Sequence, residues 1–426
     1  MKTLLVFCFL FTCLISSAQL PDTITLDFCY RQAEKHYPLS RQKDLYSQST
    51  ALHLSNLNKN WLPQTTINGI ASYQSEVTSF ALDLPATFPK IGFPNVPKDQ
   101  YKLTLDLNQS IYDGNSTNFQ KKVENTNLQA DQKNLQIQLY QLKDQINQLF
   151  FNIFYLQETE ATINSSKKQL DAKQQEIKSD VINGTQLQSN EDALEAEILL
   201  ADQQLIMLKA DRTATFKMLS QLISVEIPET AHLVLPQVAI SKYDYENKRL
   251  ESQLYDIQQG RTDILKNMVT TKWNPRLSAF GELGYGRPGL NMLSDEFKTF
   301  WMVGGKLTWN IWNWNQNKNE KKIYDLQKEI ILTQKETFDK NLRIATEKNL
   351  SEILKLTEIL VKDEDIIRLR TRITTTASSQ LTNGVINSSD YISRLNEETQ
   401  AELSMELHKI QLIKAKLYYL FTLGKL

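Results

Sequence analysis

Apolar residues recur at every seventh position along a stretch that runs from residue 116 to residue 182. This is the heptad pattern of a coiled coil, because it keeps one apolar seam on the same side of a helix. At about 1.5 Å per residue, such a helix is roughly 100 Å long. By themselves the heptads also fit a soluble coiled coil. The seam positions are Leu128, Leu135, Leu142, Leu149, Leu156, Ile163, Leu170 and Ile177.

Residues that break helices are scarce in two large parts of the chain. No proline occurs between Lys98 and Ile227, or from Gly289 to the C-terminus. Proline removes a helix hydrogen bond and glycine is a poor helix former, so their scarcity favours long helices. The sequence predicts helices at Leu26–Asn60, Ser116–Ile182, Ser189–Ile223, Tyr245–Thr271, Lys318–Thr382 and Ser388–Leu423.

Apolar and polar residues alternate in four shorter segments, two in each half of the chain. A period of two places apolar side chains on one face of a strand and polar side chains on the other. The runs Tyr101–Ile111 and Trp301–Ile311 have the length of a tilted membrane strand. The partner strands, Thr66–Val77 and Leu277–Tyr285, alternate more weakly.

These strands fit a membrane sheet better than a soluble one, although a half-buried soluble strand also alternates. Aromatic residues lie at the ends of the apolar sets, as they do in the interfacial girdle of a membrane barrel. We expect Thr104 and Thr308 to face a lumen. We expect lipid to contact Tyr101, Leu103, Leu105, Leu107, Trp301, Val303, Leu307 and Trp309.

The two halves of the chain resemble each other. At an offset of 200 positions, residues 111–115 (Ile-Tyr-Asp-Gly-Asn) match residues 311–315 (Ile-Trp-Asn-Trp-Asn), and Asn-Gly at 183–184 matches Asn-Gly at 383–384. Trp-Leu-Pro at 61–63 matches Trp-Asn-Pro at 273–275 at an offset of 212. The difference falls in Leu84–Lys98, which holds four prolines and is predicted to be a loop.

Each half is therefore predicted to contain a helix, two strands, a very long helix, a turn and a further helix. The chain starts with Met1-Lys2, an apolar run from Leu4 to Ile15 and small residues up to Ala18, which is the layout of a secretory signal peptide. The predicted organisation is a signal peptide at 1–18, a first repeat at 19–224, a linker at 225–244 and a second repeat at 245–426.

Composition argues against several function classes. The net charge is −1 and no basic stripe is present, so nucleic acid is not an expected partner. The four histidines are scattered, and Cys29 is the only cysteine after signal cleavage, so neither a metal site nor an internal disulfide is expected. No nucleophile motif or phosphate loop appears, and we predict neither an enzyme nor a cofactor.

The number of strands bears on assembly. Four strands cannot close a barrel, and each unpaired backbone group at an open edge costs several kcal/mol in lipid. Two chains would supply eight strands, a barrel filled by its own side chains. Three chains would supply twelve strands, which leave a lumen. A homotrimer therefore fits a conduit better than a dimer.

This arrangement resembles the TolC-type outer-membrane efflux proteins across nearly the whole mature chain. The matching marks are Tyr37-Pro38, the segments at 61–63 and 111–114, and the two Asn-Gly pairs. The resemblance implies a mainly α fold with membrane strands: a trimeric twelve-stranded barrel in the outer membrane and a helical tunnel in the periplasm. It also implies a periplasmic adaptor protein as a partner, together with an inner-membrane efflux pump or the ABC exporter of a type I secretion system.

The resemblance further implies a periplasmic tip that docks the adaptor, formed here by Asn183, Gly184, Asn383 and Gly384. Turns of this family carry Ser or Thr three residues after the glycine and an acidic residue six after it. Leu187 and Asn190 occupy those positions in the first half of this chain, and Asn387 and Asp390 occupy them in the second, so only Asp390 keeps the acid.

Asp390 is also a candidate for the aperture, because three copies would converge where a trimeric tunnel narrows. We assign Asn190, Asp390 and Arg394 to this aperture, and Arg394 is placed to pair with Asp390 four residues earlier. A plain helix-capping role explains Asp390 about as well.

A second function remains open: a periplasmic coiled-coil adaptor or scaffold, with a helical hairpin and a soluble β-domain. Such proteins normally have one hairpin and lack duplicated strand pairs, whereas both halves of this chain contain them. The sequence leaves the exported substrate open.

Overall fold

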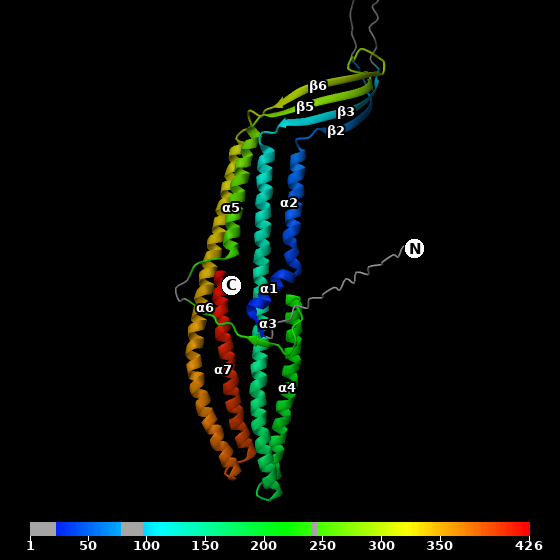
Figure 1. Ribbon diagram of the computed structural model, residues 1–426. Helices are drawn as coiled ribbons and strands as arrows, with labels where there is room; N and C mark the ends of the chain where they lie inside the picture. The colour runs from blue at the N-terminus through cyan, green and yellow to red at the C-terminus, as the bar shows by residue number, and fades with distance from the viewer. Residues whose placement is uncertain (1–22, 78–96, 241–244) are drawn as a thin grey trace, which may run out of the picture. The chain divides into compact units, whose positions relative to one another are not determined.

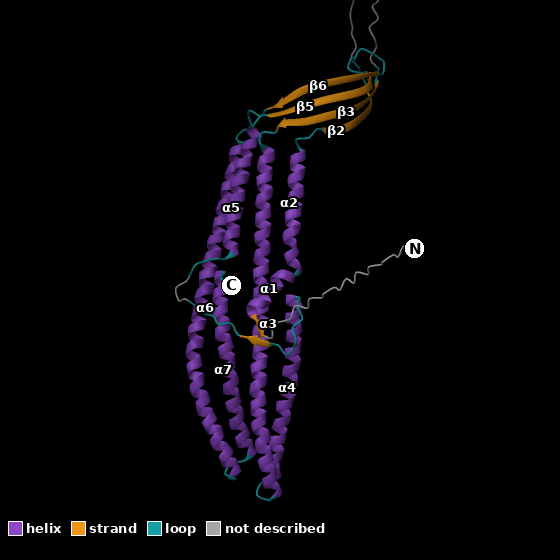
Figure 2. Ribbon diagram, in the orientation of Figure 1, coloured by secondary structure: helices purple, strands orange, loops and turns teal. Residues whose placement is uncertain are grey.

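The computed structural model describes residues 23–77, 97–240 and 245–426. The predicted signal peptide and nearly all of the predicted loop Leu84–Lys98 lie outside the described residues. The described chain is mostly helical with a few strands (Figures 1 and 2), which confirms the predicted mainly α class.

Contacts divide the chain into two compact units. Within the described residues, one comprises 23–40, 138–240, 245–249 and 342–426, and the other comprises 41–77, 97–137 and 250–341. Two long helices run through both units, and the contacts below are given within one unit at a time.

The long helices pair with shorter ones through two tight turns. Helix α3 (Ser116–Ile182) is followed by α4 (Gln188–Ile223), and α6 (Gln316–Thr382) is followed by α7 (Ser388–Leu423). Helices α3 and α6 each have 67 residues, and α4 and α7 each have 36. All four agree with the predicted bounds to within two residues, because proline and glycine are absent from their interiors.

The predicted heptad seam lies on the inner side of α3. Leu128 and Leu149 are half-buried. The other six seam residues are buried: Leu135, Leu142, Leu156, Ile163, Leu170 and Ile177. The heptad spacing thus marks the positions that pack against neighbouring helices.

The first predicted helix, Leu26–Asn60, is wrong in one respect, because it is broken near its middle. Helix α1 (Leu26–His36) and helix α2 (Gln42–Lys59) are separated by the short 3-10 helix η1 (Pro38–Arg41). Tyr37 precedes the proline and has an extended ψ of 132°, since the proline ring disfavours the helical conformation of the residue before it.

The predicted helix Tyr245–Thr271 begins later than expected. Helix α5 covers Leu250–Met268, and the 3-10 helix η2 (Val269–Trp273) continues it. The backbone N–H of Lys248 donates instead to the Leu423 carbonyl oxygen at the end of α7, 2.9 Å away. This contact holds the preceding segment outside the helix.

One unit contains a four-stranded antiparallel sheet, in the order β2-β3-β5-β6 (Figure 2). Its strands are β2 (Gln64–Tyr73), β3 (Asp99–Tyr112), β5 (Arg276–Arg287) and β6 (Lys298–Thr308). The predicted extensions of β2 to Val77 and of β6 to Ile311 are wrong. Each of these two strands ends opposite the first residue of its antiparallel neighbour. Tyr73 pairs with Asp99, the first residue of β3, and Thr308 pairs with Arg276, the first residue of β5.

The other unit contains a small parallel sheet that the sequence did not predict. Strand β1 (Thr23–Thr25) pairs with β4 (His232–Val234), which lies inside the predicted linker. The sheet packs on a core drawn from α1, α3, α4 and α7, whose most buried members include Ile24, Cys29, Phe150, Phe216, Leu219 and Ile223.

Candidate functional site

The four-stranded sheet has one apolar face that is open in the single chain. All eight side chains predicted to contact lipid are between 42% and 70% exposed. Trp309 differs from the expectation in one detail, because it lies one residue beyond the end of β6. Its indole Nε1 donates to the Trp273 carbonyl oxygen at 2.9 Å, which fixes the ring at this end of the sheet.

Pairing between the strands aligns apolar side chains in rows. Leu105 in β3 lies opposite Ile67 in β2 and opposite Leu283 in β5, and Leu283 in turn lies opposite Trp301 in β6. The period of two puts this whole row on one face. Each of the four side chains is at least 42% exposed, so within the described residues no second layer covers the row.

The opposite face of the sheet is polar and internally bonded. Asp106 accepts a hydrogen bond from Asn68 at 2.5 Å and another from the Thr104 hydroxyl at 3.0 Å. Lys102 forms an ion pair with Glu282 across β3 and β5 at 2.6 Å. The alternation predicted from the sequence therefore separates a polar face from an apolar one.

Two aromatic rings interrupt the polar face. The Phe300 ring lies directly over Gly284 of β5, and a Cβ built on that glycine would be 2.1 Å from the ring. Phe280 covers Gly304 of β6 in the same way, at 2.7 Å. The period of two puts Phe280 on this face, but it does not reveal that each ring occupies the space above a glycine of the neighbouring strand.

The two helix turns share one backbone conformation. Gly184 and Gly384 have φ values of 75° and 69°, the left-handed region that favours glycine. At the first turn, the N–H of Thr185 donates to the Asp180 carbonyl oxygen at 2.9 Å and that of Gly184 donates to Val181 at 3.0 Å. These are the two bonds of a Schellman motif, and the same pair occurs at the second turn.

The predicted tip residues lie at these turns and are exposed. The Asn383 side-chain amide donates back to the Ser379 carbonyl oxygen of its own helix at 2.7 Å, so only part of its hydrogen-bonding capacity is free for a partner. No contact of this kind is found for Asn183 among the described residues. Both turns end helices whose buried residues share one core, which includes Leu170, Ile177, Leu194, Leu381, Tyr391 and Leu395.

The chain resembles known proteins in its structure and not in its sequence. No family profile matches the chain, and no curated protein sequence matches it significantly. Solved structures do. The outer membrane protein VceC of Vibrio cholerae is 12% identical with a TM-score of 0.66, over 94% of this chain and 96% of VceC. The outer membrane channel CmeC of Campylobacter jejuni is 14% identical with a TM-score of 0.65, over 94% of this chain and 85% of CmeC.

The MtrE outer membrane channel of Neisseria gonorrhoeae, solved in its open state, is 15% identical with a TM-score of 0.66, over 94% of this chain and 89% of MtrE. The chain has the outer-membrane channel fold. The resemblance to TolC-type proteins that the sequence predicted is thus confirmed at the level of the fold.

Within this channel fold, the predicted aperture residues form different contacts from those expected. Arg394 bonds Glu397 at 3.2 Å, and Glu397 also pairs with Arg370 of α6. Among the described residues no ion pair joins Arg394 to Asp390, so the predicted pairing is wrong. Glu397 lies three residues after Arg394 on the same helix, which is also a favourable spacing for an ion pair, and it takes the place expected for Asp390.

Asp390 is exposed in the first turn of α7, where its backbone N–H donates to the Asn387 side chain at 2.9 Å. It also lines a groove of about 470 Å³ between α6 and α7. Apolar and charged side chains both line the groove; its lining residues are Arg372, Ile373, Thr376, Ala377, Gln380, Ile386, Asp390 and Arg394.

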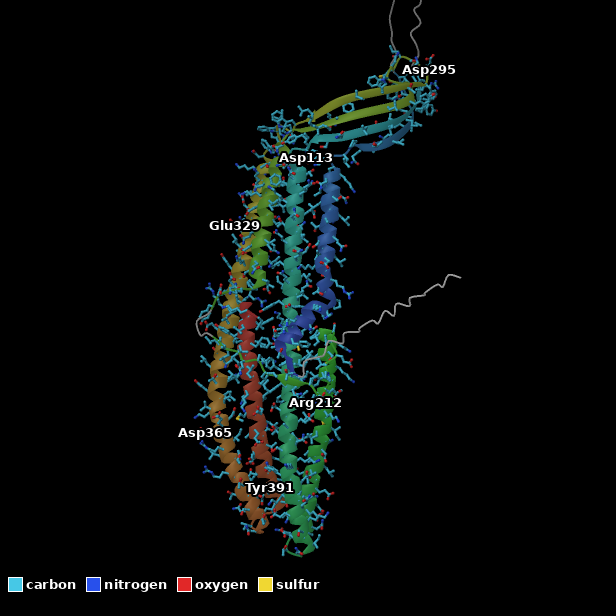
Figure 3. The ribbon with its side chains drawn as sticks, in the orientation of Figure 1. Asp113, Arg212, Asp295, Glu329, Asp365 and Tyr391 are labelled. Atoms are coloured by element: carbon cyan, nitrogen blue, oxygen red, sulfur yellow. The ribbon has the colours of Figure 1, made fainter. Side chains whose placement is uncertain are left out.

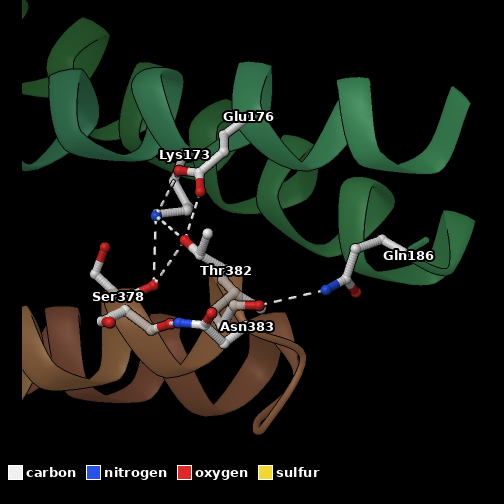
Figure 4. Close-up of polar contacts among 8 residues, drawn as sticks. Lys173, Glu176, Gln186, Ser378, Thr382 and Asn383 are labelled. Atoms are coloured by element: carbon white, nitrogen blue, oxygen red, sulfur yellow. Dashed lines mark hydrogen bonds and ion pairs between the residues drawn. The ribbon is translucent and has the colours of Figure 1, made fainter. Parts of the chain in front are cut away.

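Asn190, the third predicted aperture residue, joins the two turns. Its side-chain oxygen accepts the backbone N–H of Ser388 at 3.1 Å, so it caps α7 from α4. Gln186 completes the link, because its amide donates to the Leu381 carbonyl oxygen of α6 at 3.3 Å (Figure 4). The sequence did not predict this role, which depends on contact between residues about 200 positions apart.

A buried lysine bonds the two long helices near the same turns (Figure 4). Lys173 of α3 is 8% exposed and contacts Glu176 at 2.7 Å and the Thr382 hydroxyl of α6 at 3.1 Å. Burial raises the pKa of Glu176, but hydrogen bonds from Lys173 and Thr382 outweigh it and hold the pKa below its ordinary value.

Burial also raises the pKa of the nearby Tyr391 phenol, labelled at the turn end of α7 in Figure 3.

Among the described helices none has an apolar stretch long enough to cross a membrane. In the same residues, His, Cys, Asp and Glu side chains do not gather in groups of three that would suit a metal ion.

Proposed function

We propose that three copies of this chain form an export channel in the outer membrane of a Gram-negative cell, with a helical extension in the periplasm. The observation that carries the proposal is the apolar row Ile67, Leu105, Leu283 and Trp301, which crosses all four strands and stays exposed. Lipid suits such a row, whereas a soluble sheet would bury it under a second layer. The channel fold supports the same function.

The two edge strands support assembly as a ring. Among the described residues, β2 and β6 each have one side without a partner strand, and such edges cannot remain open in lipid. Pairing β6 of one copy with β2 of the next closes three copies into a twelve-stranded barrel with a lumen. The polar face would then line that lumen, with Thr104 and Thr308 on it.

We propose further that the chain consists of two repeats, 19–224 and 245–426, joined by a linker at 225–244 and preceded by a signal peptide at 1–18. Helices α3 and α6 begin 200 positions apart and have equal lengths, as do α4 and α7. Gln64 pairs with Asn108, and the residues 212 and 200 positions further on, Arg276 and Thr308, pair with each other. Equal registers support duplication.

The repeats also predict the register in which β6 of one copy pairs with β2 of the next. Within one chain Leu107 lies opposite Gly281, and the corresponding residues in the other repeats are Leu307 and Gly69. The same residue types therefore recur at both positions. Leu307 of one copy should lie opposite Gly69 of the next.

In this proposal the turns dock a periplasmic adaptor protein that is attached to an inner-membrane efflux pump or ABC exporter. Asn183 and Asn383 are exposed there, and the groove of about 470 Å³ beside Asp390 is lined by both apolar and charged side chains, a combination that suits an amphipathic helix. The conduit is passive, and the pump selects the cargo.

Purification in detergent tests the proposal. Light scattering corrected for bound detergent should give three copies per particle, and an outer-membrane fraction should show heat-modifiable migration on gels. A folded, stable monomer would contradict barrel sharing. Recovery in the soluble periplasmic fraction would favour the adaptor or scaffold alternative instead.

A further inference from the structure

Trp314 occupies a backbone conformation that suits glycine. Its φ is 51° and that of Asn315 is 63°; 200 positions earlier, Gly114 and Asn115 have φ values of 70° and 73°. A bulky residue is an outlier in this region. Trp314 is nevertheless 80% exposed, so burial within the described part of one chain does little to compensate for the strain.

The corresponding turn in the first half is tightly covered by the same chain. The Asn274 side-chain amide donates to the Gly114 carbonyl oxygen at 2.8 Å. A Cβ on Gly114 would lie 2.9 Å from the Asn274 Cβ and 3.1 Å from the Thr271 carbonyl oxygen. Glycine is required here because the segment that follows α5 presses directly on the turn.

The segment that would cover Trp314 is found by the repeat relation. Residues 271–274 correspond to residues 59–62 in the first half, at an offset of 212. A side-chain hydrogen bond that recurs at corresponding positions in both halves supports this match independently. Trp309 Nε1 donates to the Trp273 carbonyl oxygen at 2.9 Å, and Gln109 Nε2 donates to the Trp61 carbonyl oxygen at 3.4 Å.

We propose that Trp314 of one copy packs against Leu62 of a second copy, at the point where the strands of one chain meet those of the next. This inference rests on the proposed ring, in which β6 of one copy adjoins β2 of its neighbour. The junction between β3 and β5 inside the chain is then repeated between chains, and residues 59–62 of the second copy lie where Asn274 lies inside the chain.

The side chains on the two sides of the junction differ together. Inside the chain, glycine meets asparagine, and an amide hydrogen bond joins them. Between copies, tryptophan meets leucine, and both are exposed in the single chain, at 80% and 56%. Leu62 has no side-chain amide that could donate to the carbonyl oxygen of Trp314, while its apolar surface suits an indole. The junction between copies is therefore wider and sealed by an apolar contact.

Disulfide trapping tests this contact on the full chain in detergent. In the double variant Trp314→Cys with Leu62→Cys, oxidation should produce linked dimers and trimers that revert to monomers on reduction. The matched control combines Trp314→Cys with Leu290→Cys, because Leu290 is similarly exposed but lies in the connection that leaves the opposite end of β5. The native Cys29 is fully buried and is left in place.

Light scattering on the same samples separates the two proposals. Trimers without linkage above the control would overturn the contact and leave the channel intact, whereas a monomer would overturn both. Strong quenching of a bimane label on Trp314→Cys by brominated phospholipid, with no linkage in the double variant, would assign Trp314 to the lipid interface and also overturn the contact.

A second pair of variants does not require new cysteines. Trp314→Gly relieves the left-handed strain, so it should raise the temperature of trimer dissociation if residue 314 touches nothing. The proposed contact predicts a lower temperature instead. Leu62→Ala should also lower it, and should add little further loss in the Trp314→Gly background, because coupled residues are not additive. Full additivity would overturn the contact.

Discussion

Substitution of Leu105 by arginine tests the assignment of the apolar face. Leu105 is the seventh of the fourteen residues of β3 and is 42% exposed in the single chain. An arginine on the lipid face near the bilayer midplane costs about 2–4 kcal/mol. Three copies therefore lose on the order of 6–12 kcal/mol per trimer, which corresponds to about four orders of magnitude or more in assembly.

The structure also selects the control. Thr104 is only 7% exposed and bonds Asp106, so changing it would disturb more than the face it occupies. Thr66 is exposed on the polar face and lies opposite Asp106, where an arginine gains about 0–1 kcal/mol from the pair. Trimer yield after refolding into lipid vesicles, read from heat-modifiable migration, should collapse for Leu105→Arg and persist for Thr66→Arg. Equal yields would refute the face assignment.

Three further predictions concern the helices α3, α4, α6 and α7 and the turns between them. Asn183→Arg combined with Asn383→Arg should abolish export while trimers persist, measured as cargo accumulation in cells; unchanged export would place adaptor docking elsewhere. Asp390→Asn should lower cation selectivity and divalent block in planar-bilayer recordings, because three carboxylates focused in a narrow mouth concentrate cations; identical recordings would leave Asp390 only its place in the first turn of α7. Burial first, and two neighbouring glutamate charges second, raise the pKa of Glu402 above its ordinary 4.5. Its ionisation therefore opposes folding as pH rises, so Glu402→Gln should raise the melting temperature at neutral pH and not at pH 4 or below; an equal gain at both pH values would exclude titration as the cause.

Patterns within single elements could be predicted from the sequence, and contacts between distant elements could not. The heptads and the lack of proline placed α3 and α6 to within two residues. Alternation identified the apolar and polar faces around Leu105. The break at Tyr37 was missed although Pro38 is a local signal for it, because a proline inside a helix removes a hydrogen bond and disfavours the helical conformation of the residue before it.

The polar contacts at the turns illustrate the same limit. Glycine spacing predicted both turns, since a left-handed residue is a local requirement. Arg394 was expected to pair with Asp390 at a separation of four residues, but it pairs with Glu397 at a separation of three, and Glu397 also contacts Arg370 of α6. The cap that Asn190 provides to Ser388 spans almost 200 positions and has no local pattern.

At two pairs of corresponding positions, the two halves of the chain differ where each half has different surroundings. The backbone is the same at Gly114 and Trp314, yet one position is covered by its own chain and the other is open. Asn190 caps the neighbouring hairpin, while Asp390, its counterpart, faces solvent. A monomer built from two repeats has no reason to place differences in this way. A ring in which contacts within a chain alternate with contacts between chains does, because corresponding residues then face chemically different surfaces.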